Sequence, residues 1–269
     1  MTLSPIAFIG GGNMASALIG GLVRSGRPSD SILVVEPYDA QRDKLHQQFG
    51  VVPLAAADAT LQRAGTVVWA VKPQSFAEAS AACRGLVGGA LQLSVMAGVR
   101  SDALVAASGS ARVVRAMPNT PALIGRGIAG LYARPEVDAA ARAEIEALFK
   151  PTGQSLWVAA EDDLDAVTAL SGSGPAYVFY FLEAMMQAGA EMGLPPDQAR
   201  ALGQATFAGA AALAMASPLT PAELRAQVTS KGGTTHAAIT SLDTSAVKDA
   251  FVRALHAARH RAQELGKAG

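Results

Sequence analysis

The chain has 269 residues; half are hydrophobic, 16% are charged, and 22 Lys and Arg balance 22 Asp and Glu. This composition excludes a disordered chain and favours one or two globular domains. The basic residues are scattered, which argues against nucleic-acid binding and against a polybasic membrane patch. Because Cys83 is the only cysteine, the chain has neither an intrachain disulfide nor a cysteine metal cluster.

The first apolar run enters a glycine turn and lacks the basic flank and cleavage site of a signal peptide. The longest apolar stretch, residues 207–216, is too short and too rich in alanine to span a bilayer. We therefore expect a cytoplasmic protein with no membrane span.

A glycine-rich turn lies between a predicted strand, residues 6–9, and a predicted helix that runs to about residue 26. Gly10 permits a sharp turn, Gly12 lets the backbone approach phosphates, and the small Ala15 lets the helix pack closely. The N–H groups of the helix start would face an anion. The pattern predicts a site for a dinucleotide pyrophosphate; the alternative is an ordinary glycine-rich turn.

A second predicted strand, residues 31–36, ends in Glu36, 26 residues after Gly10. An acid at this place can hydrogen-bond the adenosine ribose hydroxyls, and it would repel the 2′-phosphate of NADP. No arginine follows at once, so the residues lean towards NADH. The alternative is a solvated charge at the end of a strand.

Alternating strand and helix patterns continue along the first half of the chain. Strands are predicted at residues 51–52, 66–71, 91–96 and 112–116, and residues 128–132 and 155–158 flank a helix near 136–149 and extend the sheet. This alternation predicts right-handed β-α-β units, and therefore an α/β fold with a Rossmann-type, doubly wound parallel sheet. Lys72 and Arg115 lie at strand ends, where they can meet ligand anions or form structural ion pairs.

Strand signals stop near Asp162, and the remaining sequence has helical spacing. Residues 175–193 and 245–265 place apolar side chains on one helical face, and residues 195–197 open a further helix. We predict two domains, a dinucleotide-binding domain at 1–160 and an all-helical domain at 161–269.

Two glycine-containing stretches, residues 171–177 and 230–236, precede helices in this second half. The second combines backbone N–H groups at a helix start with three hydroxyls, which suits a small carboxylate. The alternative, which the residues alone favour slightly, is a capped turn between two helices.

The histidines offer further candidates. His256, His260 and Glu264 share a helix face at a spacing that a metal can use, but flanking arginines favour a solvated face, and we predict no metal. His236 follows the glycine-threonine turn and is a candidate for catalysis; a buried, hydrogen-bonded histidine is the commoner outcome.

One group of β-hydroxyacid dehydrogenases carries a lysine in a G-x-G-x-x-x-K motif. Aligning Gly172 and Gly174 with its glycines puts Val178 at the lysine position, so the acid or base for alcohol–ketone chemistry is missing there. A C=N bond is a better substrate, because an imine is basic enough to be protonated near neutrality. Positioning beside a hydride donor then carries the catalysis.

Five motifs in order resemble the pyrroline-5-carboxylate reductase family over nearly the whole chain: residues 9–15, 70–74, 115–121, 165–177 and 228–235. The resemblance implies hydride transfer from NADPH or NADH to the C=N bond of 1-pyrroline-5-carboxylate, which gives L-proline in the last step of its biosynthesis. It also implies a homodimer with interleaved helices, in which each site combines one subunit's cofactor domain with its partner's helices, and further assembly into a ring of dimers.

The resemblance also assigns residues. The pyrophosphate would be held by Gly10, Gly11, Gly12, Asn13 and Met14, and the cofactor groove would be lined by Ala70, Val71, Lys72, Pro73 and Ala97. The substrate carboxylate would bind the loop of Ser230, Gly232, Gly233, Thr234 and Thr235. The hydroxyl of Thr235 would reach the ring nitrogen as the catalytic group, and Glu161 would stand near the substrate.

Two positions depart from the family pattern. Lys231 stands where the family usually has proline, so the loop is either looser or more attractive to a carboxylate. Glu36 and Pro37 stand where members that prefer NADP tend to have hydroxyl or basic residues. The remaining alternatives are a reductase of another small cyclic imine or carbonyl acid, and a non-catalytic dinucleotide-sensing subunit, which would need no anion receptor at 230–235.

Overall fold

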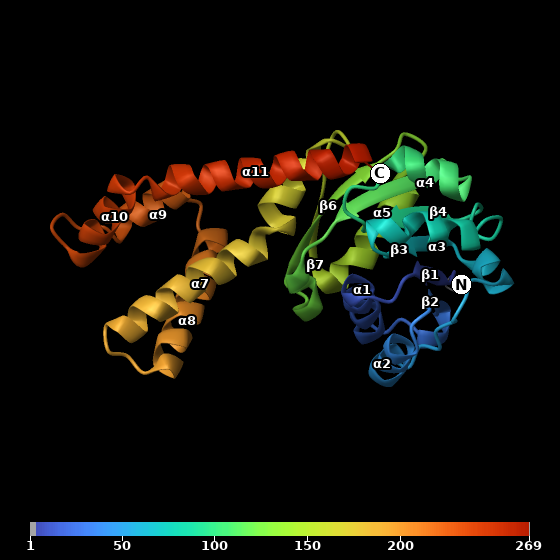
Figure 1. Cartoon of the computed structure of the whole chain (residues 1–269), viewed down its shortest axis with the longest axis horizontal. Helices are drawn as coiled ribbons and strands as arrows, with labels where there is room; N and C mark the ends of the chain where they lie inside the picture. Colours follow the sequence, from blue (N-terminus) through green and yellow to red (C-terminus); the bar gives the residue numbers. More distant parts are fainter. Residues whose placement is uncertain (1–3, 269) are drawn as a thin grey trace. The chain divides into compact units, whose positions relative to one another are not determined.

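The computed structural model describes residues 4–268 and divides into two compact units. The first contains the chain up to residue 174 together with the segment from residue 258 onward, and the second contains residues 175–257 (Figure 1). These two units are defined by how compactly their residues pack. The domain boundary at residue 160 rests on the sequence pattern alone and stays a prediction.

A seven-stranded sheet forms the centre of the first unit, in the order β2-β1-β3-β4-β5-β6-β7. The strands are β1 (Ile6–Ile9), β2 (Ile32–Val35), β3 (Thr66–Trp69), β4 (Leu91–Ser94), β5 (Val113–Met117), β6 (Gly127–Ala133) and β7 (Gly153–Trp157). All neighbours pair in parallel except β5 and β6. The predicted Rossmann-type α/β fold is confirmed, and strand order reverses between β1 and β3.

Helices cover both faces of this sheet (Figure 1). They are α1 (Asn13–Arg24), α2 (Asp39–Phe49), α3 (Phe76–Ala82), α4 (Ser101–Ser108) and α5 (Ala139–Phe149), with a further short helix, α6 (Asp163–Val167), before a π-helical turn (Thr168–Gly172). One buried apolar cluster joins the sheet to α1, α2 and α5, and a second joins it to α3 and α4. Strands β1, β3 and β4 are buried along their whole length, as expected of parallel strands between two helical layers.

Two details differ from the sequence prediction. Residues 51–52 form no strand, and Leu54 instead makes one isolated bridge with Val35. The strand predicted at 128–132 is β6, which runs antiparallel to β5. The connection between them, residues 118–126, contains only a 3₁₀ turn (Thr120–Ile124) and is shorter than the crossover that a parallel pair requires.

The second unit is helical throughout. It contains α7 (Gly174–Glu191) from residue 175, α8 (Pro196–Ala216), α9 (Pro221–Gln227), α10 (Thr234–Thr244) and the first part of α11 (Val247–Ala268). The predicted helices are thus present, yet apolar side chains of α7 stay open to solvent: Val178 is 40% exposed and Tyr180 is 70% exposed. The single chain does not cover this face.

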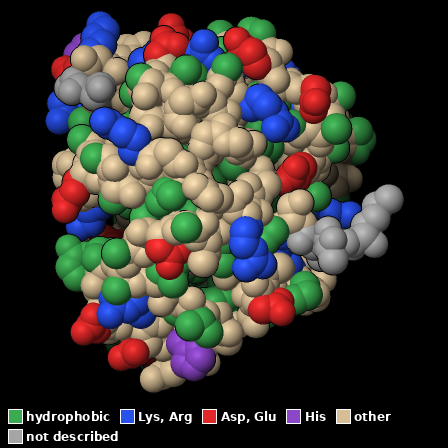
Figure 2. All heavy atoms as spheres, turned by 90° about the vertical axis from the view of Figure 1, so that its right-hand side faces the viewer, with side chains coloured by type: hydrophobic (Ala, Val, Ile, Leu, Met, Phe, Trp, Pro, Cys, Tyr) green, Lys and Arg blue, Asp and Glu red, His purple; other side chains and the backbone are tan. Residues whose placement is uncertain are grey.

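The surface carries both signs of charge. On the face drawn in Figure 2, Lys and Arg side chains lie among Asp and Glu side chains, without a continuous basic stripe. Among the described residues, none of the helices combines the length and apolar character that a bilayer crossing requires.

The side chains of Trp69 and Gln92 form a hydrogen bond inside the sheet. We predict that Gln92 contributes more to the free energy of unfolding than an exposed glutamine of the same sheet does. The Gln92 Oε1 accepts a 2.9 Å hydrogen bond from the Trp69 indole, and its Nε2 donates to the carbonyls of Val87 and Ala90. Gln92→Leu leaves the indole N–H of Trp69 without a partner, whereas the carbonyls of Val87 and Ala90 keep the N–H of Ala90 and the hydroxyl of Ser110 as donors, so the variant should destabilise the protein by about 2 kcal/mol. Urea unfolding measures the loss, and Gln154→Leu on the exposed side of β7 is the matched control. Equal losses in the two variants would contradict the prediction.

Candidate active site

The predicted cofactor residues meet at the carboxyl edge of the sheet. The glycine loop follows β1, Glu36 follows β2, the segment 70–73 follows β3, and Ala97 lies just beyond β4. Because β1 lies between β2 and β3, these loops are neighbours. Gly10 has a φ of 95°, and a Cβ added there would stand 2.7 Å from the carbonyl oxygen of Ala70, so only glycine fits.

The start of α1 is open to an anion. Gly12 precedes the helix, no side chain caps it, and the place of a Cβ on Gly12 has no atom within 4 Å. Both Gly12 and Asn13 are exposed. The N–H groups of the first helical turn therefore lack partners and face open space, a geometry that fits a pyrophosphate.

Glu36 lies beneath the glycine loop. Its side chain is 6% exposed, so it is not the solvated charge that was the alternative. Its Oε2 accepts a 2.8 Å hydrogen bond from the N–H of Gly11, and its Oε1 accepts one of 3.0 Å from the N–H of Tyr38. Arg42 donates to the carbonyl oxygens of Glu36 and Pro37.

Glu161 anchors a partly buried polar network in the first unit. Its carboxylate accepts from the backbone N–H of Ser101 at 2.7 Å, from the Ser101 hydroxyl at 2.8 Å, and from the Arg115 guanidinium at 2.8 Å. The Nη2 of Arg100 lies 3.5 Å from the Oε2 of Glu161. Of the two interpretations of Arg115, the structure shows the ion pair, whereas Lys72 is exposed at the sheet edge.

This network controls the ionisation of Glu161. Burial favours the neutral acid, but the two hydrogen bonds from Ser101 and the hydrogen bond and charge of Arg115 outweigh it, so the pKa of Glu161 lies below its ordinary value. For Cys83, burial acts alone and raises the pKa of the thiol to about 11, because no cation compensates it. Cys83 is thus an inert core residue.

The predicted carboxylate loop lies in the second unit, before α10. Gly232 has a φ of 77°, Gly233 precedes the helix, and no side chain caps it. Ser230, Lys231 and Thr234 are exposed, and Thr235 is half-buried. The capped turn that was the alternative would need a side-chain cap, so the start of α10 keeps unpaired N–H groups like those of α1.

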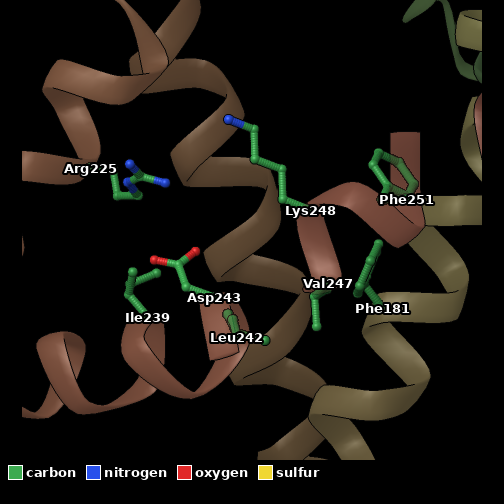
Figure 3. Close-up of a pocket in the computed structure, with 8 residues that line it drawn as sticks. All are labelled: Phe181, Arg225, Ile239, Leu242, Asp243, Val247, Lys248 and Phe251. Atoms are coloured by element: carbon green, nitrogen blue, oxygen red, sulfur yellow. The ribbon is translucent and has the colours of Figure 1, made fainter. Parts of the chain in front are cut away.

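The other candidates do not form a site. The ring of His260 lies 3.3 Å from Glu264, which also accepts from Arg261. Within residues 4–268, no three His, Cys, Asp or Glu side chains are arranged to hold a metal. A cavity of about 220 Å³ in the second unit contains none of the predicted site residues (Figure 3). It is lined by Phe181, Arg225, Ile239, Leu242, Asp243, Val247, Lys248 and Phe251.

Comparisons with known proteins show which family the chain resembles. The family model of pyrroline-5-carboxylate reductase dimerisation matches residues 161–265, and that of NADP oxidoreductase, coenzyme F420-dependent, matches residues 5–98. A pyrroline-5-carboxylate reductase from Pseudomonas aeruginosa is 42% identical over 272 residues, which are 99% of this chain and 98% of the relative. The chain belongs to the pyrroline-5-carboxylate reductase family.

Solved structures of the family show the same fold. The pyrroline-5-carboxylate reductase from Coxiella burnetii has a TM-score of 0.89 at 35% identity and covers 98% of this chain and 99% of its own. The Plasmodium falciparum pyrroline carboxylate reductase, solved with NADP bound, has a TM-score of 0.89 at 25% identity and 99% coverage of both chains. The family, the enzyme class and the reaction predicted from the sequence are confirmed by these matches.

Two contacts of this arrangement were not predicted from the sequence. Neither the contact of Ser101 with Glu161 nor the contacts of Gln41 with the glycine loop have a motif, because each joins residues far apart in the chain. The one available signal was that an acid follows a strand or a serine precedes a helix, which many sequences share.

We expect the Glu161 network to stabilise the fold in a pH-dependent way. The pKa of Glu161 is lower in the folded chain than in the unfolded one, so its stabilisation is present above the unfolded pKa of about 4.3 and is lost as pH falls through the folded value. Glu161→Gln should cost about 2 kcal/mol at neutral pH, and the deficit should shrink below about pH 4.3.

Urea unfolding across a pH series measures this deficit. Asp162→Asn is the control, since Asp162 is an exposed carboxylate paired with Arg100, and its loss should cost at most about 0.5 kcal/mol. A Glu161→Gln deficit that does not change between neutral and acidic pH would refute the assignment.

Proposed function

We propose that this chain transfers hydride from NADPH or NADH to the C=N bond of 1-pyrroline-5-carboxylate and forms L-proline, with dinucleotide residues in the first unit and substrate residues in the second. The observation that carries this proposal is the uncapped start of α10 behind Gly233, which supplies the anion receptor that the substrate needs. A non-catalytic dinucleotide-sensing subunit would have no use for it.

The first unit holds the cofactor in this proposal. The glycine loop and the start of α1 bind the pyrophosphate, and the groove is lined by Ala70, Val71, Lys72, Pro73 and Ala97. When bound, the dinucleotide supplies the hydride. The open space at Gly12 and the unpaired N–H groups of α1 support this assignment.

The second unit orients the substrate. The N–H groups of Thr234 and Thr235 bind its carboxylate, while the N–H of Gly233 donates to the carbonyl oxygen of Ser230 at 3.0 Å and shapes the turn. The exposed Ser230 and Gly232 complete the loop, and the ammonium of Lys231 adds attraction for the anion. The Thr235 hydroxyl orients the ring nitrogen by a hydrogen bond. The imine is protonated near neutrality, so the chain contributes position rather than strong acid. Glu161 stands near the substrate pocket while Ser101 and Arg115 hold its carboxylate.

The matching dimerisation family indicates a homo-oligomer. We propose a homodimer in which each site combines one subunit's cofactor residues with its partner's helices, with rings of dimers as the further assembly and the cytoplasm as its place. Apolar side chains that the single chain leaves exposed support it, since such surfaces mark interfaces. They include Val178, Phe179, Tyr180, Met185, Leu202, Leu213, Met215 and Val252.

Thr235→Ala tests the catalytic assignment. Loss of the orienting hydrogen bond should lower kcat about tenfold to hundredfold and leave the fold intact. Circular dichroism and dinucleotide binding check that fold. Thr235→Ser, which keeps the hydroxyl, should retain most of the rate, and Thr240→Ala on the same helix is the matched control. A wild-type rate in Thr235→Ala would remove the assigned role.

The cofactor preference forms a separate prediction. The charge of Glu36 disfavours the 2′-phosphate of NADPH, so we expect NADH to give the higher kcat/KM, although the Plasmodium falciparum relative was solved with NADP. Absorbance loss with each cofactor at equal concentration, together with detection of L-proline, measures it. A strong preference for NADPH would refute the prediction. No L-proline with either cofactor would refute the proposed function.

A further inference from the structure

The backbone of Gly11, the middle glycine of the loop, is held on both sides of its Cα. The N–H of Gly11 donates to the Oε2 of Glu36 at 2.8 Å, in a buried hydrogen bond. The carbonyl oxygen of the same residue accepts from the Nε2 of Gln41 at 2.5 Å and from the hydroxyl of Ser16 at 3.3 Å. Both backbone polar groups of Gly11, which belong to two successive peptide units, are thus fixed by side chains from the end of β2, from α2 and from α1.

Packing around Gly11 leaves no space for a side chain at this position. A Cβ added to Gly11 would stand 2.6 Å from the Cδ1 of Leu45, a fully buried side chain of α2, and 3.2 Å from the Glu36 carboxylate. Glu36 is itself held by the N–H of Tyr38 on its second oxygen. Arg42 braces the backbone of Glu36 through its carbonyl oxygen.

We propose that Glu36 and Gln41 are positioning residues that clasp the backbone of Gly11, by its N–H and its carbonyl oxygen respectively, and set the glycine loop in the conformation that binds a dinucleotide. Glu36 therefore acts on the cofactor through Gly11. This inference rests on the proposed assignment of the glycine loop to the dinucleotide. It removes the N–H of Gly11 from the anion site and leaves the N–H groups of Gly12, Asn13 and Met14 to bind the pyrophosphate.

Three variants separate positioning from charge. Glu36→Gln keeps the shape, but its amide offers one acceptor oxygen to two N–H groups, so one of the two bonds is lost. Gln41→Leu removes the donor to the carbonyl oxygen of Gly11 without changing any charge. Asp39→Asn is the matched control, because it removes a carboxylate at the start of α2 that is 86% exposed and pairs with Arg42 rather than with Gly11.

The first measurement needs no cofactor. Amide hydrogen exchange of the segment 9–17 in the ligand-free, full-length protein should accelerate about tenfold in Glu36→Gln and in Gln41→Leu, and stay unchanged in Asp39→Asn. Unchanged exchange in both clasp variants would overturn the proposal. Since no dinucleotide is present, this result does not depend on the proposed function.

The second measurement is steady-state kinetics with both cofactors. Gln41→Leu, which changes no charge, should raise the KM of NADH and of NADPH by similar factors, about tenfold, and Glu36→Gln should raise the KM of NADH about tenfold, while kcat and the KM of the imine substrate stay within about twofold in both variants. A Glu36→Gln variant that gains activity with NADPH alone, with the KM of NADH unchanged, would overturn the proposal and assign Glu36 to the 2′ position. A wild-type protein that binds neither cofactor would refute the proposed function, and the exchange result would still decide the clasp.

Discussion

The parallel pairing of β1 with both β2 and β3 is the constraint on which the cofactor half of the site depends. It places three strand ends side by side at one edge, so that Gly10 touches Ala70 and Gly11 touches Glu36. None of these contacts is local in sequence. They arise because parallel strands present their carboxyl ends together, and because strand order reverses beside β1 and opens a crevice there. A sheet with another order would scatter the same residues.

A second constraint is that useful backbone groups must stay unpaired. Helices α1 and α10 both start behind a glycine without a side-chain cap, whereas the other uncapped helix starts, such as those of α2 and α4, follow a residue that carries a side chain, and Asp138 caps α5. A cap contributes about 1 kcal/mol of helix stability, so leaving it out costs stability at both places. The cost is understandable where a phosphate or a carboxylate completes the helix start.

The sequence predicted those features that depend on local pattern. Buried β-branched runs gave the central strands, and Gly10 and Gly12 gave the turn, since their conformational need is written in a few adjacent residues. The antiparallel direction of β6 was not predicted from the strand pattern, because a strand's direction depends on the length of the connection that precedes it, here residues 118–126. The Glu36 contact with Gly11 and the Glu161 contact with Ser101 were not predicted either, because tertiary packing alone selects one partner among many. The spacing from Gly10 identified Glu36 as a candidate, but only the structure shows which N–H groups donate to it.

The distribution of charge over the site fits the chemistry of an imine. A carbonyl reductase needs a strong acid beside the reacting oxygen, whereas a protonated C=N bond needs orientation and a nearby hydride donor. The loop before α10 offers hydroxyls, amides and Lys231. The carboxylates of Glu36 and Glu161 both accept hydrogen bonds from groups within the first unit. Each buried charge therefore fixes a backbone segment. The rate should then depend on how rigidly the two uncapped helix starts are held, which makes the peptides around them, rather than any titrating side chain, the parts of this enzyme most sensitive to substitution.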